Sequence, residues 1–155
     1  MVAETVQVES FDGFVRRYEP RLREALSASL GSDPGKDATA EAMAYAWEHW
    51  EKVRAMDNPM GYLYVLGRNR GRRTAIRRRV VLLPTPQEAT PWVEPHLPDA
   101  LGALPEQQRV VVMLLHCFEW TMSEVAEFLD VSKSTVQSHA ERGMARLRKR
   151  MGVTT

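Results

Sequence analysis

The sequence predicts an all-α fold of two small helical domains joined by a proline-rich linker. Apolar residues recur every three or four positions along most of the 155-residue chain, which is the periodicity of helices. No segment shows the apolar–polar alternation that is typical of a strand. Five of the nine prolines lie within residues 80–98, where the helical period is lost and an extended linker is expected.

The first domain is expected over residues 10–79 and contains three helices. An apolar stripe predicts a first helix over residues 11–30. A second helix is expected over residues 37–53, with Asp37 as its N-cap and with Trp47 and Trp50 on its buried face. Asn58 and Pro59 predict the start of the third, because Asn caps helices and Pro fits the first helical position.

The second domain is expected over residues 99–151 and ends in a helix-turn-helix. Thr121 and Glu124 have the spacing of a capping box, which predicts a short helix after them. Ser132 is the expected N-cap of the last helix, which follows a tight turn at residues 130–131. Two short helices joined in this way are typical of proteins that read DNA.

Polar side chains on the outer face of the last helix are the candidates for contacts with duplex DNA. Lys133 and Arg142 suit phosphate or guanine, and the amide of Gln137 suits adenine. His139 is expected to fill the helix interface instead. The full set of candidates is Lys133, Ser134, Thr135, Gln137, Ser138, Glu141 and Arg142.

Basic residues are concentrated in two stretches of a chain whose net charge is only +1. Residues 68–79 hold seven arginines and no acid, and residues 142–150 hold five basic residues and no acid. One such run alone would suggest a solvated helix face. Two runs, one of them directly behind a helix-turn-helix, predict two separate contacts with a polyanion.

The sequence carries no signature of an enzyme, a metal site or a membrane protein. A carboxylate pair suited to acid–base catalysis, a glycine-rich phosphate loop and a Cys/His pair are all absent from the sequence, so we expect neither catalysis nor a cofactor. The four histidines lack metal-ligand spacing. No apolar run reaches membrane-spanning length. The one cysteine, Cys117, is expected to be buried and favours a reducing compartment, hence the cytoplasm.

The two predicted domains together resemble a sigma factor of bacterial RNA polymerase. Residues 58–69 match the stretch in which Pro is followed by an aromatic-Leu-Tyr, a small residue, Arg and Asn. Residues 37–47 resemble the acidic helix ending in Ala-Trp, and residues 104–109 the Leu-Pro…Gln-Arg signature. The length and order are similar to the sigma-70 family of the extracytoplasmic-function type (group 4), which keeps only domains 2 and 4.

The resemblance implies two partners, core RNA polymerase and promoter DNA, with the chain as a monomer on polymerase. Domain 2, residues 10–79, would dock on polymerase through Asp37, Glu41 and Glu48 and would recognise and melt the −10 element. Domain 4, residues 99–151, would read the −35 element. The implied −10 residues are Arg54, Asp57, Asn58, Arg68, Asn69, Arg72, Arg73, Arg77, Arg78 and Arg79.

Several points stay open at the level of sequence. Ala40 stands where the family has Gln, and Arg73 where it has Asp, which affects the docking and melting surfaces. Tyr62 and Tyr64 are expected in the core, with base stacking as the alternative. The family is often held inactive by an anti-sigma protein, and the sequence leaves open whether this chain has one; Trp50, Trp92 and Trp120 are candidate attachment residues.

The alternative function is a dimeric DNA-binding regulator of the LuxR type. Such a protein would bind a palindromic duplex without polymerase. This interpretation explains residues 132–139, which are similar to the DNA-reading helix of LuxR-type proteins. It leaves the arginine run and residues 58–69 without a role.

Overall fold

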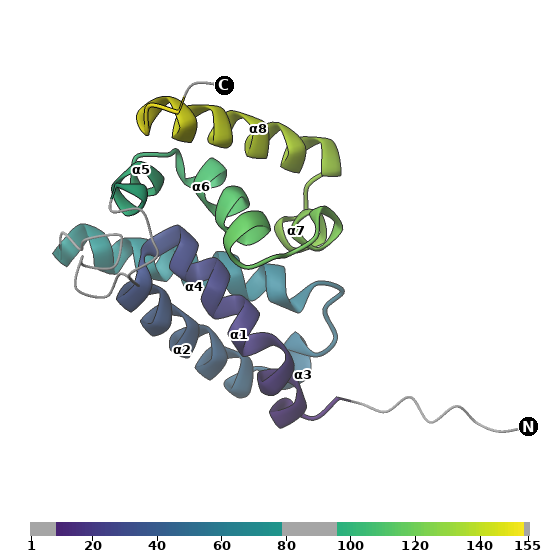
Figure 1. Ribbon diagram of the computed structural model, residues 1–155. Helices are drawn as coiled ribbons and strands as arrows, with labels where there is room; N and C mark the ends of the chain where they lie inside the picture. The colour runs from purple at the N-terminus through teal and green to yellow at the C-terminus, as the bar shows by residue number, and fades with distance from the viewer. Residues whose placement is uncertain (1–8, 79–95, 154–155) are drawn as a thin grey trace, which may run out of the picture.

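The computed structural model describes residues 9–78 and 96–153, with side chains for all of these except 74–78 (Figure 1). The all-α class is confirmed, since no strand occurs within these ranges. No helix in the described part of the chain is long and apolar enough to cross a bilayer. The elements are α1 Phe11–Leu30, α2 Ser32–Glu48, α3 Trp50–Val53, α4 Pro59–Arg78, α5 Leu97–Gly102, α6 Glu106–Val112, the π-helix η2 Met113–Cys117, α7 Met122–Leu129 and α8 Lys133–Arg150.

Helices α1, α2 and α4 pack together into what we call the N-terminal module, residues 11–78. The first helix begins and ends where the sequence predicts, and the Ser10 hydroxyl caps it by accepting a 3.1 Å hydrogen bond from the Gly13 amide. The predicted start of α4 is also confirmed. There the Asn58 side-chain oxygen accepts a 3.0 Å hydrogen bond from the Gly61 amide.

The second helix differs from the prediction at both ends. It begins at Ser32 instead of residue 37, so Asp37 lies inside α2 and is not its N-cap. Only Gly31 separates α1 from α2, with a φ of 100° that favours glycine. Pro34 fits because it lies in the first turn, where its missing amide hydrogen costs nothing. At the other end, His49 interrupts the helix before the single turn of α3.

Residues 34 and 35 lie within α2, where this helix crosses α1 closely. A Cβ atom on Gly35 would lie 2.5 Å from the Cα of Ser27, so glycine lets α2 lie directly against α1. Gly35 is therefore a packing residue inside α2.

The aromatic residues of the N-terminal module are distributed differently from the prediction. Trp47 is 65% exposed, contrary to its expected inward position, and its ring lies 5.0 Å from that of Phe11. Trp50 is half-buried. Of the two tyrosines expected in the core, Tyr64 is buried, whereas Tyr62 is 37% exposed.

Helices α5 to α8 and η2 form the C-terminal module, residues 97–150, in which α8 packs on α6 and α7. Its first helix starts at Leu97, two residues before the predicted start, because Pro98 fits the first turn. The capping box of Thr121 and Glu124 and the cap at Ser132 are both confirmed. The π-helix η2 was not predicted, and it leaves Cys117 exposed instead of buried.

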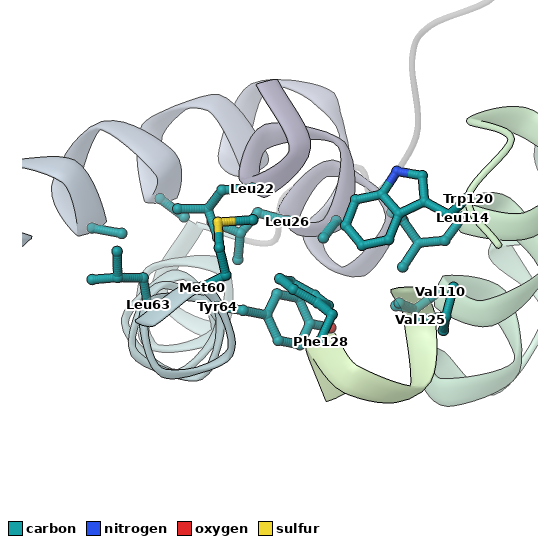
Figure 2. Packing of buried hydrophobic residues seen from close by; sticks show 14 of the residues in the cluster. Leu22, Leu26, Met60, Leu63, Tyr64, Val110, Leu114, Trp120, Val125 and Phe128 are labelled. Carbon is teal, nitrogen blue, oxygen red and sulfur yellow. The ribbon is translucent and has the colours of Figure 1, made fainter. Parts of the chain in front are cut away.

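The two modules share one hydrophobic core (Figure 2). Leu26 and Tyr64 of the N-terminal module lie in the same buried cluster as Leu114, Trp120 and Phe128 of the C-terminal module. The Phe128 ring lies 5.0 Å from that of Tyr64 and 5.2 Å from that of Trp120. The modules are therefore closed on one another. The predicted linker falls, up to residue 95, outside the described residues.

Candidate nucleic-acid interface

The helix-turn-helix is formed by α7, the residues 130–132 and α8. Asp130 ends α7 in the left-handed conformation, with a φ of 56°, and Ser132 then caps α8. Val136, Ala140, Gly143 and Leu147 form the buried inner face of α8. Of the predicted DNA-reading residues, five are exposed and two are half-buried: Lys133, Ser134, Gln137, Glu141 and Arg142 in the first group, Thr135 and Ser138 in the second.

Two of the predicted reading residues are hydrogen bonded to each other. The Gln137 amide nitrogen donates to the Glu141 carboxylate across one helical turn, at 3.0 Å. This bond engages the amide nitrogen of Gln137. A bidentate contact with adenine uses both the nitrogen and the oxygen of the amide, so it would require this pair to rearrange. In the first turn, the hydroxyls of Ser134 and Thr135 each lie 2.9 Å from the Ser132 hydroxyl. These short side chains order the start of α8.

Two predicted −10 residues share an exposed face of α4 with Tyr62, and a third is exposed just before this helix. Asn69 and Arg73 are exposed on α4 and lie seven and eleven residues after Tyr62, which places all three on one face of the helix. Arg54, just before α4, is exposed and forms a 2.7 Å ion pair with Glu51.

Three other predicted −10 residues face the C-terminal module instead. Arg72 forms an ion pair with the carboxylate of Glu106, and Arg68 Nε lies 4.0 Å from the same carboxylate. The side-chain nitrogen of Asn58 donates to the Glu127 carbonyl oxygen at 2.9 Å. The closed arrangement therefore divides the predicted surface between an exposed part and a covered part.

The remaining predicted −10 residues are only partly described. Asp57 is exposed and lies at the end of the connection before α4. Arg77 and Arg78 belong to α4, but their side chains are not among those described, and Arg79 lies outside the described residues.

The Glu106 carboxylate stays ionised in this contact. Its partial burial favours a higher pKa, but hydrogen bonds from Arg72 and Ser29 and the charges of both arginines outweigh it and lower the pKa. The Ser29 hydroxyl donates to Glu106 Oε1 at 2.8 Å. An ionised Glu106 thus neutralises arginines that the sequence assigns to DNA.

The predicted polymerase-docking residues form one stripe along α2. Asp37, Glu41 and Glu48 are all exposed and lie four and seven residues apart, which places them on one face. Ala40, the departure from the family pattern, is exposed as well. This acidic stripe is distinct from the arginine-bearing face of α4.

Among the side chains that the structure describes, the most buried charged one was not a sequence-based candidate. Arg109 is 5% exposed, and its guanidinium donates hydrogen bonds to the carbonyl oxygens of Ala28, Ser29 and Leu104. Burial lowers the pKa of this guanidinium, which nevertheless stays protonated at neutral pH. The only sequence signal was the Leu-Pro…Gln-Arg signature itself, which gave no role to its last residue.

Two further contacts across the modules involve Trp120. Its indole nitrogen donates to Glu24 at 2.8 Å, and the guanidinium of Arg21, which pairs with Glu124, lies 4.9 Å from its ring. Trp120 is 5% exposed, so it is not available as an attachment residue in this arrangement. Trp92 lies outside the described residues. Within the described ranges, no cluster of His, Cys, Asp and Glu side chains is arranged as a metal site.

Comparison with known proteins gives the family. The family model for sigma-70 region 4 matches residues 97–147. The RNA polymerase sigma-E factor of Streptomyces coelicolor is 31% identical over 157 aligned residues, covering 94% of this chain and 88% of that protein. The chain belongs to the RNA polymerase sigma factors. It is a sigma-70 factor of the extracytoplasmic-function type.

Other relatives agree with this assignment. The sigma-E factor of Streptomyces antibioticus is 28% identical over 90% of this chain and 87% of its own length. The fold resembles that of the sigma factor RpoE of Bartonella quintana, solved with the anti-sigma factor NepR, with a TM-score of 0.64, 21% identity and coverage of 96% and 100% of the two chains. It also resembles CnrH, solved with the cytosolic domain of CnrY, with a TM-score of 0.59, 20% identity and coverage of 94% and 89%.

This sigma factor assignment decides between the two functions that the sequence left open. The LuxR-type regulator is not favoured, because the similarity extends through both modules and not only through the helix-turn-helix. Sigma factors are regulatory DNA-binding proteins and not enzymes.

Proposed function

We propose that this sigma factor binds core RNA polymerase and directs it to promoters, with the two modules reading the two promoter elements. Residues 10–79 would act as domain 2 and residues 99–151 as domain 4, joined by the linker over residues 80–98. The observation that carries the proposal is the presence of an exposed reading helix, α8, and a separate exposed face of α4 that bears Tyr62, Asn69 and Arg73.

The reading helix suits the major groove of the −35 element. Lys133 and Arg142 present cations to phosphates or guanine, and Gln137 can read adenine once it leaves Glu141. The remaining candidates of α8, the short hydroxyls and Glu141, would lie near the backbone or accept from cytosine.

The α4 face suits an unpaired −10 strand. Single-stranded DNA is bound by cations that follow its phosphates and by aromatic rings on which bases stack. Arg73 and Tyr62 supply one group of each kind, and Asn69 adds a polar contact. Asn58, Arg68 and Arg72 would join this surface only after the C-terminal module moves away, because they are engaged with Glu127 and Glu106.

Docking on polymerase is assigned to the acidic stripe of Asp37, Glu41 and Glu48. An anti-sigma protein that binds both modules would keep them closed and the covered arginines unavailable. On polymerase we expect a monomer, acting in the cytoplasm where the chromosome lies, and we assign no cofactor.

Run-off transcription tests this function. Core polymerase free of sigma factors is incubated with genomic DNA, with and without the full-length chain. Defined start sites that appear only with the chain are the expected result. Absence of initiation, together with dimeric binding to a palindromic duplex without polymerase, would overturn the proposal.

A further inference from the structure

A cluster of aromatic and cationic side chains lies where α2 ends and α4 begins, beside the face described above. The rings of Tyr45 and His49 are stacked, with centroids 4.1 Å apart and an interplanar angle of 19°. The Tyr45 hydroxyl lies 3.1 Å from that of Tyr62 on α4. Lys52 Nζ lies 5.7 Å from the Tyr62 ring centroid, and the Arg70 guanidinium 5.6 Å from that of Tyr45.

Packing against the core accounts for Tyr45 but not for the other members of this cluster. His49, Lys52 and Arg70 are exposed, and Tyr45 is only half-buried. The closest acid to Lys52 in sequence, Glu51, is paired with Arg54 at 2.7 Å. The hydrogen bond with Tyr45 raises the pKa of Lys52, so its ammonium stays charged. The cluster thus presents an exposed ring, that of His49, and an exposed cation, Lys52, both in contact with Tyr45.

Exposed rings beside cations form the surface that single-stranded nucleic acid requires. Bases stack on aromatic faces whatever their identity, and ammonium and guanidinium groups hold the phosphates. The cluster is continuous with the proposed −10 surface, because Tyr62 belongs to both. The positive charge of the cluster is complementary to the phosphates of a DNA strand, whereas a basic protein surface would be repelled.

We propose that His49 and Lys52 bind the unpaired promoter strand, with a base stacked on the His49 imidazole and a phosphate held by the Lys52 ammonium. This extends the strand-binding surface from α4 onto the end of α2 and onto α3, and it rests on the proposed function. Tyr45 supports the His49 ring by stacking on one of its faces, and it contacts Tyr62 through its hydroxyl.

The alternative role of His49 is to end α2. Its Nδ1 lies 3.1 Å from the Tyr45 carbonyl oxygen, one turn earlier, as expected for a C-terminal capping contact. The two roles need different atoms. His49→Phe keeps a ring for stacking and loses the capping contact, whereas His49→Asn keeps a polar cap and loses the ring.

The test uses holoenzyme, assembled from core polymerase and the full-length chain, and a fluorescein-labelled promoter fragment whose −10 region is left unpaired. The promoter is taken from the run-off assay. We expect His49→Asn to weaken binding by about 5- to 150-fold, the effect of losing one base-stacking ring, and His49→Phe to bind like the wild type. If His49→Asn binds normally, or if both variants are equally weak, the stacking role is wrong.

Lys52→Gln tests the phosphate contact against Lys36→Gln, which removes the same charge from an exposed position at the opposite end of α2. Loss of one phosphate contact should lower the slope of binding against salt by about 0.7, and Lys36→Gln should leave it unchanged. Equal slopes for the two variants would overturn the assignment of Lys52.

The failure of this inference is distinguishable from that of the proposed function. If the wild-type chain supports no run-off transcription, the proposed function fails. If the wild type initiates and the His49 and Lys52 variants bind the unpaired promoter as it does, only this inference fails. Thermal unfolding of each variant identifies any loss that comes from misfolding.

Discussion

The Nε of Arg109 donates a 2.9 Å hydrogen bond to the carbonyl oxygen of Ala28, which lies 81 residues earlier in the chain. A second nitrogen of the same guanidinium bonds to the carbonyl oxygen of Ser29, also at 2.9 Å. These are carbonyls of the last turn of α1, which lack partners within the helix. A cation at the C-terminal end of a helix is also favoured by the helix dipole. The C-terminal module thus caps a helix of the N-terminal module.

Arg109→Leu is expected to destabilise the closed arrangement strongly. The substitution removes three donors and leaves buried carbonyl oxygens without partners, which should cost about 2–5 kcal/mol. The free energy of unfolding in urea measures this. The unfolding free energy of Arg109→Lys should lie between those of the wild type and Arg109→Leu, because one ammonium cannot reproduce the forked geometry of a guanidinium. An unfolding free energy equal to the wild type for Arg109→Leu would show that Arg109 does not hold the modules together.

Glu106→Gln is expected to strengthen binding of the isolated chain to DNA. The ionised carboxylate neutralises Arg72 and Arg68, and the amide would release their charge while still accepting from Ser29. Up to two added phosphate contacts should steepen the salt slope for single-stranded DNA by about 1.4. Fluorescence anisotropy with a labelled single strand measures the slope. Asp12→Asn, an exposed change of the same charge, is the control; an equal effect there would mean that net charge alone is responsible.

The closed arrangement should weaken in acid. The pKa of Glu106 is lowered in the folded state, so its contribution is complete above the pKa of the unfolded chain and is lost as pH falls through the lowered value. Fluorescence of Trp120, which lies in the shared core, should therefore change in the acid range. Glu106→Gln should show a smaller change in this range. If the fluorescence change in that variant is as large as in the wild type, other carboxylates cause it.

The sequence predicted the helices more accurately than the contacts between them. Caps such as Asn58, Thr121 and Ser132 are local, so residue type and spacing identify them. The predicted start of α2 was wrong because Gly35 packs against Ser27 of α1, a contact between two helices that the local sequence does not reveal. The exposure of Trp47 and Tyr62 likewise depends on which neighbours the fold supplies.

The candidate site was limited in the same way. The basic run over residues 68–79 was visible in the sequence, but its division between an exposed face and Glu106 was not. That division depends on a contact between residues 34 positions apart, Arg72 and Glu106. The π-helix η2 had no sequence signal that we could identify.

The reading helix can be tested through Gln137 and Glu141. Gln137→Ala should cost about 1–3 kcal/mol of discrimination at one base pair of the −35 element. Glu141→Ala should change discrimination at that base pair less, because it only releases the Gln137 amide from its 3.0 Å hydrogen bond. Competition binding of holoenzyme to promoters with single −35 substitutions measures both. Uniform weakening across all base pairs would mean that Gln137 contacts the backbone and not a base.

Reversing the charges of Glu41 and Glu48 to Lys should weaken assembly with core polymerase. Both side chains are exposed on α2, so the substitutions should leave the free energy of unfolding nearly unchanged. Size-exclusion chromatography with core polymerase measures assembly. Glu19→Lys, an exchange of the same charge on α1, is the control. Assembly equal to the wild type would move the docking surface away from the acidic stripe.

Site-specific crosslinking within the holoenzyme tests the central claim most directly. A photoreactive residue is placed at position 69, on the outer face of α4, or at position 137, on the reading helix. We predict that position 69 crosslinks to the −10 element and position 137 to the −35 element, about two turns of duplex upstream. Crosslinks from both positions to the same element, or to both halves of a palindrome without polymerase, would contradict the assignment of the two modules.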